Sequence, residues 1–117
     1  MSEKTVQNKS KAFAIRIINL YKFLTDSKKE FVMAKQVLRS GTSIGANVSE
    51  SDYAISKADF ISKTQIAIKE AVETRYWLEL LFETEFITQD QFNSLNFDCN
   101  ELIKLLASIL KSSKQKP

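Results

Sequence analysis

Charged and polar side chains recur at helical spacing in the middle of the chain, where an apolar core would otherwise be expected. One set, with spacings of four, four and three residues, is Arg39, Ser43, Asn47 and Glu50. A second set is Asp59, Glu70 and Glu73, with Arg75 on the neighbouring apolar stripe. Residues three or four apart share one face of a helix, so each set predicts a polar ladder. Such ladders could bind a metal, perform acid–base catalysis or pair helices through ions.

Metal binding is the least favoured of these three interpretations. Di-iron centres inside helical bundles combine glutamates with Glu-x-x-His motifs on two helices, and this chain contains no histidine. Cys99 is the only cysteine, so a cluster of thiolate ligands is excluded as well. Cys99 lies among apolar residues at helical spacing, which favours a small buried core residue over a reactive thiol. We therefore expect no metal and no other cofactor.

Acid–base catalysis would use Glu70 and Glu73, which are one helical turn apart. Paired carboxylates can divide the roles of acid and base when their surroundings separate their pKa values. However, the chain supplies no nucleophile, oxyanion hole, phosphate-binding loop, zinc-protease motif or serine elbow around them. We therefore predict that the protein is not an enzyme.

The favoured interpretation of the ladders is a structural polar network. Arg39 and Arg75 would pair between helices with Glu50, Glu70 or Glu73, and Asn47 would complete the hydrogen bonds. Such buried pairs contribute little net stability, but a wrong alignment of the helices would leave a charge unpaired. The network could also lie at an interface between subunits.

Apolar residues recur every three or four positions over four stretches, which predicts helices over about residues 9–25, 30–53, 57–83 and 89–111. Capping boxes at Ser56 and Thr88 open the last two helices. Gly41 and Gly45 fall inside the second stretch, where they indicate either a close backbone contact or a loop at residues 40–43. Periodic residues on both sides favour a continuous helix. Short connections make neighbouring helices antiparallel, so we predict one all-α domain over residues 1–117, an up-down-up-down four-helix bundle.

The positive charge of the chain is concentrated at its two ends. Residues 1–11 carry a net charge of +2 and residues 111–117 carry +3, which leaves −2 for the remainder of a chain whose net charge is +3. We expect flexible tails at residues 1–8 and 112–117. No apolar stretch is long enough for a membrane span, and the N-terminus lacks the apolar centre of a signal peptide. These features predict a cytoplasmic protein with no membrane partner.

The third predicted helix is apolar on more than one side. Arg75, Tyr76 and Trp77 could stack on nucleic-acid bases, but adjacent helical positions point about 100° apart and do not form one platform. Trp77 is therefore expected to be an anchor in the core or at an interface. A second apolar face carries Phe60, Ala67, Trp77 and Leu81. A symmetric copy of the chain would bury this excess, which favours a homo-oligomer.

Three segments, at residues 38–48, 58–63 and 67–78, closely resemble the family of 23S rRNA intervening-sequence proteins, also labelled S23 ribosomal protein. The resemblance extends over about residues 10–110. It implies an antiparallel four-helix bundle assembled into a cyclic pentamer, without known enzymatic activity. The family is named for reading frames within sequences inserted into 23S rRNA genes. This chain has Ser49-Glu50-Ser51 where an alanine-glutamate-glycine sequence is commoner.

The family is also similar to the accessory variability determinant proteins, pentameric bundles associated with nucleic acid and a reverse transcriptase. The resemblance thus implies a non-enzymatic, oligomeric accessory factor that associates with RNA or DNA. The alternative is a structural or adaptor ring that binds a protein partner and no nucleic acid. The candidate phosphate contacts near the chain ends are Lys4, Lys9, Lys11, Lys111, Lys114 and Lys116, and those on helix surfaces are Arg16, Lys22 and Lys104. A ring would bring the lysines of all subunits together.

Overall fold

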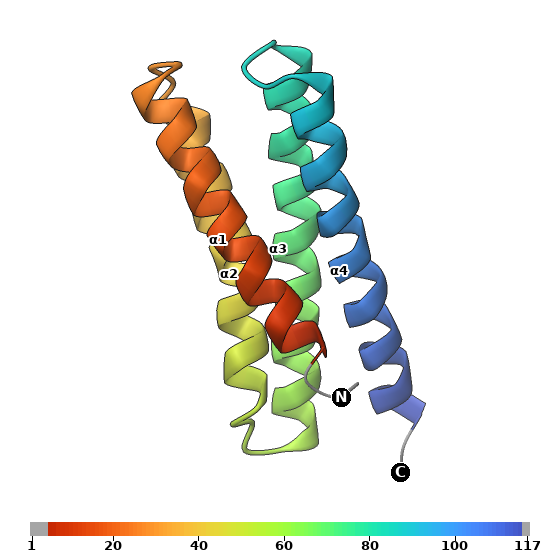
Figure 1. Ribbon diagram of the computed structural model, residues 1–117. Coiled ribbons are helices and arrows are strands. Elements are labelled where there is room, and N and C mark those ends of the chain that lie inside the picture. The colour runs from red at the N-terminus through yellow and green to blue at the C-terminus, as the bar shows by residue number, and fades with distance from the viewer. Residues whose placement is uncertain (1–4, 116–117) are drawn as a thin grey trace.

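Four α-helices make up the regular structure of residues 5–115, which are the residues that the computed structural model describes. They are α1 (Thr5–Asp26), α2 (Val32–Ser51), α3 (Lys57–Glu83) and α4 (Gln89–Gln115). Each helix runs antiparallel to the preceding one, and the rod they form measures 50 × 22 × 22 Å (Figure 1). The prediction of an all-α, four-helix fold is confirmed. None of these helices combines the length and the apolar character that crossing a membrane would require.

The outer ends of the first and last helices were predicted too far inside the chain. The first helix begins at Thr5 instead of residue 9, because the buried stripe continues backwards from Phe13 through Ser10 to Val6. The last helix continues to Gln115 instead of residue 111. Residues 5–8 and 112–115 are therefore helical, although we expected them in flexible tails, while residues 1–4 and 116–117 lie outside the described range.

The core consists of one apolar stripe from each helix. Its buried side chains include Phe13, Ile17 and Leu24 of α1, Val37 and Ile44 of α2, Leu78 and Leu81 of α3, and Leu102 and Leu106 of α4. The spacings of three, four and seven residues follow the helical period. Because only one stripe of each helix is needed for this core, the other faces are available for polar contacts between helices.

Gly41 and Gly45 lie inside one continuous α2 helix, so the alternative of a loop at residues 40–43 is wrong. A Cβ atom on Gly41 would lie 2.8 Å from both Cγ atoms of Ile17, which is fully buried. A Cβ atom on Gly45 would lie 3.3 Å from the carbonyl oxygen of Ser10. The two glycines therefore allow the backbone of α2 to approach α1 closely.

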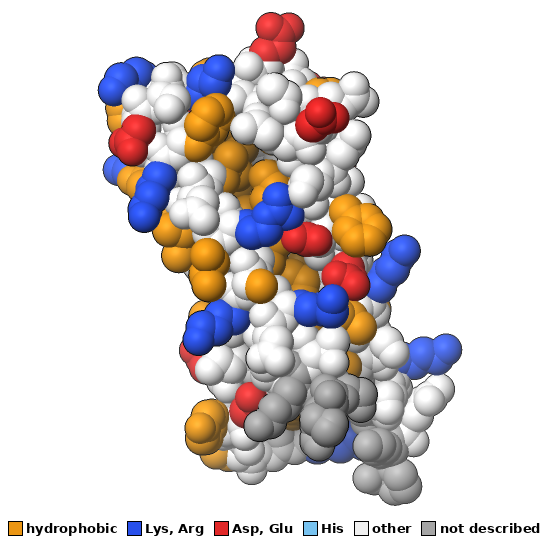
Figure 2. Space-filling model, in the orientation of Figure 1, with side chains coloured by type: hydrophobic (Ala, Val, Ile, Leu, Met, Phe, Trp, Pro, Cys, Tyr) orange, Lys and Arg blue, Asp and Glu red, His pale blue; other side chains and the backbone are white. Residues whose placement is uncertain are grey.

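The bundle is open along part of the boundary between α1 and α4. The α1–α2 hairpin diverges from the α3–α4 hairpin toward the end that holds their loops (Figure 1). A hollow of about 290 Å³ lies there, lined by Arg16, Asn19, Leu20, Phe23, Gln91 and Leu95. Hydrophobic side chains are visible on the floor of this crevice (Figure 2). The boundary between these two helices is thus only partly closed by packing.

Candidate functional site

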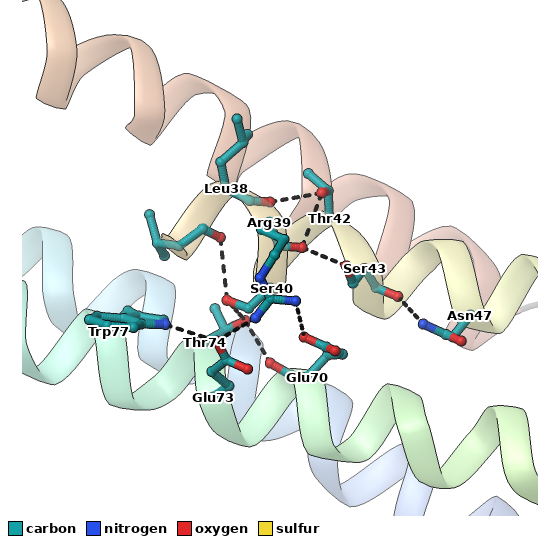
Figure 3. A network of polar contacts seen from close by, with 11 residues as sticks. Leu38, Arg39, Ser40, Thr42, Ser43, Asn47, Glu70, Glu73, Thr74 and Trp77 are labelled. Carbon is teal, nitrogen blue, oxygen red and sulfur yellow. Dashed lines mark hydrogen bonds and ion pairs between the residues drawn. The ribbon is translucent and has the colours of Figure 1, made fainter. Parts of the chain in front are cut away.

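The most connected polar group lies on the boundary between α2 and α3. Arg39 of α2 reaches across to two carboxylates of α3: its Nη1 lies 3.3 Å from Glu70 Oε1, and its Nη2 contacts Glu73 Oε2 (Figure 3). The indole N–H of Trp77 donates to the same Glu73 oxygen at 3.2 Å. One guanidinium thus compensates two acidic groups that are one helical turn apart.

The electrostatics of Glu73 are those of a carboxylate held in an ion pair. The hydrogen bonds from Arg39 and then from Trp77 hold the pKa of Glu73 below its ordinary value, and the bond to Glu73 raises the pKa of Arg39. A general acid near neutral pH needs the opposite, a carboxyl whose pKa is raised. The Arg39 side chain is also 50% exposed, so the network that we expected in the core lies at the surface. Its long side chains emerge beside the apolar stripes and end in solvent.

The other members of the predicted network do not join this group. Ser43 donates to the carbonyl of Arg39 and Asn47 to the carbonyl of Ser43, so both bonds remain within α2. Glu50 pairs with Lys63 at 2.9 Å. The predicted pairing of Arg75 with a glutamate is wrong: it faces α4, where its Nη1 donates to Asn100 Oδ1 at 3.0 Å.

A buried pair of hydroxyls beneath this network escaped the sequence analysis. Ser40 and Thr74 are fully buried, and their oxygens lie 2.9 Å apart across the α2–α3 boundary. The Thr74 hydroxyl is also 2.8 Å from the carbonyl oxygen of Glu70, to which it can donate. Both residues fall on the apolar stripes of their helices, and small polar residues at core positions were the signal that could have identified them.

No group of three or more histidine, cysteine, aspartate or glutamate side chains within residues 5–115 is placed to hold a metal ion. Cys99 is fully buried, and its Sγ lies 3.2 Å from the carbonyl oxygen of Ala71. Burial raises the pKa of this thiol to about 12, which leaves it almost entirely protonated near neutral pH. The interpretation of Cys99 as a small core residue is confirmed.

The predicted phosphate contacts fall into two groups. Lys9 and Arg16 hold α1 to α4: Lys9 Nζ lies 3.3 Å from Glu101 Oε2, and Arg16 Nη1 lies 2.7 Å from Asp98 Oδ2. Arg16 also donates to the Ser94 hydroxyl at 2.8 Å. These two cations are therefore engaged within the bundle, and sequence reasoning missed that role.

The second group consists of exposed lysines that make no ion pair with any other residue between 5 and 115: Lys11, Lys22, Lys104, Lys111 and Lys114. Lys11 lies in the first half of α1, and Lys104, Lys111 and Lys114 lie in the second half of α4. The start of α1 and the end of α4 lie at the same end of the bundle (Figure 1). Lys22 lies toward the opposite end, and Lys4 and Lys116 lie outside the described residues.

Comparisons with known proteins agree with this architecture. The crystal structure of a protein of unknown function from the S23 ribosomal protein family of Bacteroides thetaiotaomicron is 60% identical in sequence, with a TM-score of 0.93. The match covers 95% of this chain and 99% of that one. No functionally curated protein matches the chain. The profile of the 23S rRNA-intervening sequence protein family matches residues 2–108. The chain belongs to the 23S rRNA-intervening sequence protein family.

Proposed function

We propose that this chain is a non-enzymatic, homo-oligomeric accessory protein that binds nucleic acid. The observation that carries the proposal is the set of exposed lysines that pair with no acidic residue among residues 5–115, Lys11, Lys104, Lys111 and Lys114, toward one end of the bundle. Phosphate binding requires cations that are not already neutralised, because affinity comes from replacing the counterions of the nucleic acid. Lys9 and Arg16, which are paired with acidic residues, contribute less to this surface.

Self-association is supported by the outer surface of α3. The second apolar face predicted for this helix was placed wrongly, because its members Ala67 and Leu81 are fully buried in the core. The exposed apolar residues of α3 are instead Ile66, Val72 and Tyr76, which are 38%, 42% and 53% exposed. Covering this surface with further copies of the chain removes apolar area from water. A closed ring also multiplies the lysines available to one nucleic acid, so weak single contacts add up. The same apolar surface supports the second candidate function, a ring that binds a protein partner.

Oligonucleotide binding at several salt concentrations tests this proposal. Replacing Lys11, Lys104, Lys111 and Lys114 by glutamine should weaken binding evenly across sequences and flatten the dependence of affinity on salt. The logarithmic slope should fall by about 0.7 for each phosphate of a single strand that the variant no longer neutralises. Replacing Lys22, Lys28, Lys29 and Lys35, which lie toward the other end of the bundle, removes the same number of charges and is the matched control. Unchanged slopes after the first set of replacements would refute the assignment.

The mass of the particle separates the two candidate functions. Light scattering after size exclusion, with the ratio of absorbance at 260 and 280 nm on the same peak, measures assembly and bound nucleic acid together. An oligomer that retains nucleic acid supports the proposal. A nucleic-acid-free oligomer that captures a protein partner in a salt-insensitive manner favours the adaptor function.

A further inference from the structure

Phe97 is a large aromatic residue that projects into solvent from the middle of a well-packed helix. It is 70% exposed, whereas its neighbours Leu95 and Cys99 are buried. Two positions along a helix turn a side chain through about 200°, so burial of those neighbours holds Phe97 on the outer face. Leaving a phenyl ring in water forgoes the stabilisation that burial would bring. The position is therefore suited to a ligand that covers the ring.

Lysines continue the line of Phe97 along α4. Lys104 and Lys111 follow it at intervals of seven residues, and both are exposed. Seven residues make almost two turns, so the three side chains deviate by only about 20° at each step and are about 10 Å apart. Figure 2 shows hydrophobic and basic side chains following one another down the right-hand edge of the molecule, over α4. We call Phe97, Lys104 and Lys111 the α4 stripe.

The acidic residues beside the α4 stripe are committed elsewhere. Glu101, four residues after Phe97 and three before Lys104, is bound by Lys9 of α1, and Asp98 is bound by Arg16 of α1. Asp90 precedes Phe97 by seven residues, so the basic character is confined to the C-terminal half of the helix. The stripe therefore presents an aromatic ring followed by positive charge, and this combination favours a polyanion with exposed flat groups.

We infer that the α4 stripe binds unpaired nucleotides, with Phe97 stacking on a base while Lys104 and Lys111 contact phosphates. The inference rests on the proposed function and narrows its ligand to single-stranded nucleic acid. Aromatic side chains beside positive charge bind single strands because every unpaired base offers a π-face. In a duplex those faces are stacked on one another and inaccessible to a protruding ring. A second copy of the chain fits less well, since it would have to cover two lysines together with the ring.

The test is fluorescence anisotropy with a labelled oligothymidylate and with a duplex of the same length. Phe97→Leu keeps an apolar side chain but removes the ring, and should weaken single-strand binding about 5- to 150-fold, the range expected when one base is no longer stacked. Duplex binding and the salt dependence should not change, because the lysines remain. Tyr53→Ala is the matched control, since Tyr53 is 84% exposed in the loop after α2 and lies off the α4 stripe.

The outcomes separate this inference from the proposed function. Wild-type protein that binds neither probe would refute both. Equal binding of single strand and duplex, with no effect of Phe97→Leu, would leave the proposed function standing and overturn the stacking role. A changed particle mass for Phe97→Leu would assign the ring to a subunit contact, which also overturns it.

Discussion

Helix α1 packs against its two neighbours in two different ways. Toward α2, Gly41 and Gly45 remove the side chains between the helices, and Ile17 packs directly over the backbone of Gly41. Toward α4, the ion pairs of Lys9 and Arg16 bridge the helices, and the boundary opens into a hollow. The α1–α2 boundary is held by close packing of the two helices. The α1–α4 boundary is held in part by long charged side chains that pair in solvent.

The two modes predict different contributions to stability. Close packing is sensitive to single methyl groups, because the interior is as dense as an organic crystal. Exposed ion pairs each contribute about 0–1 kcal/mol, since water and salt compete for the charges. We therefore expect the α1–α2 boundary to open only with global unfolding, while the α1–α4 boundary opens locally first. The following changes test that contrast.

Replacing Gly41 by valine should have the largest effect. The new side chain would overlap Ile17, which is fully buried and stiff about χ1, so we expect a loss of about 1–3 kcal/mol in the free energy of unfolding, measured with urea. Gly45→Ala is the milder control, because the nearest atom to its Cβ would be the Ser10 carbonyl oxygen at 3.3 Å, against 2.8 Å to Ile17 at Gly41. If Gly41→Val were as stable as the wild type, α1 would be able to move away and the closed boundary would be the wrong description.

The buried hydroxyl pair tests whether the α2–α3 boundary is equally well packed. Ser40→Ala removes one of the two hydrogen-bond partners of Thr74 and should cost about 1 kcal/mol of unfolding free energy. Adding Thr74→Val should cost much less than a second such loss, because the two side chains act as one unit. Strictly additive losses would show that the hydroxyls do not interact.

The ion pairs of Arg39, at the surface of the α2–α3 boundary, should have a smaller effect. Arg39→Gln leaves two glutamates one turn apart and should lower the free energy of unfolding by up to about 1 kcal/mol. The pKa of Glu73 is lowered in the folded protein, so its stabilising contribution is present above the unfolded carboxyl pKa of about 4.3 and is lost as pH falls through the folded value. Unfolding measured between pH 2 and 7 should therefore depend less on pH in the variant. If the free energy of unfolding fell equally steeply with decreasing pH in both proteins, this assignment would be contradicted.

The open boundary should show the smallest change in global stability. Arg16→Gln removes the ion pair with Asp98. Both side chains of this pair are more than one-third exposed, so we expect the free energy of unfolding to fall by only about 0.2–0.5 kcal/mol. Hydrogen exchange of amides near this boundary should nevertheless accelerate in α1 and α4. Concentrated salt should reduce the difference between variant and wild type. If Arg16→Gln lowered the free energy of unfolding as much as Gly41→Val, the α1–α4 boundary would contribute as much to stability as the α1–α2 boundary, contrary to this expectation.

Much of the fold could be predicted because its determinants are local. Helix type, the apolar stripes and the continuous helix through Gly41 all follow from periodicity within one segment. The position of Arg39, Glu70 and Glu73 on facing polar ladders was also visible as a spacing. These features do not require knowledge of how two helices are aligned.

The polar partners were harder to predict, because they depend on the alignment of helices that are distant in the sequence. Arg16 and Asp98 are 82 residues apart, and nothing in either segment specifies that they meet. The same limit applies to Arg75, whose position on an apolar stripe suggested burial beside a glutamate. The orientation of α3 about its axis instead places the Arg75 guanidinium against Asn100 of α4. The start of α1 was missed for a different reason: one additional buried residue, Val6, is enough to extend this helix by a turn.

The burial of Cys99 against the backbone of α3 makes this residue a built-in probe of how often α4 separates from α3. A protonated, enclosed thiol does not react with alkylating reagents until α4 separates from α3 and the thiolate forms in solvent. Since each chain holds one cysteine, every modification counts one separation of these two helices. The rate of Cys99 alkylation can therefore report how readily α3 and α4 separate, without introducing any label.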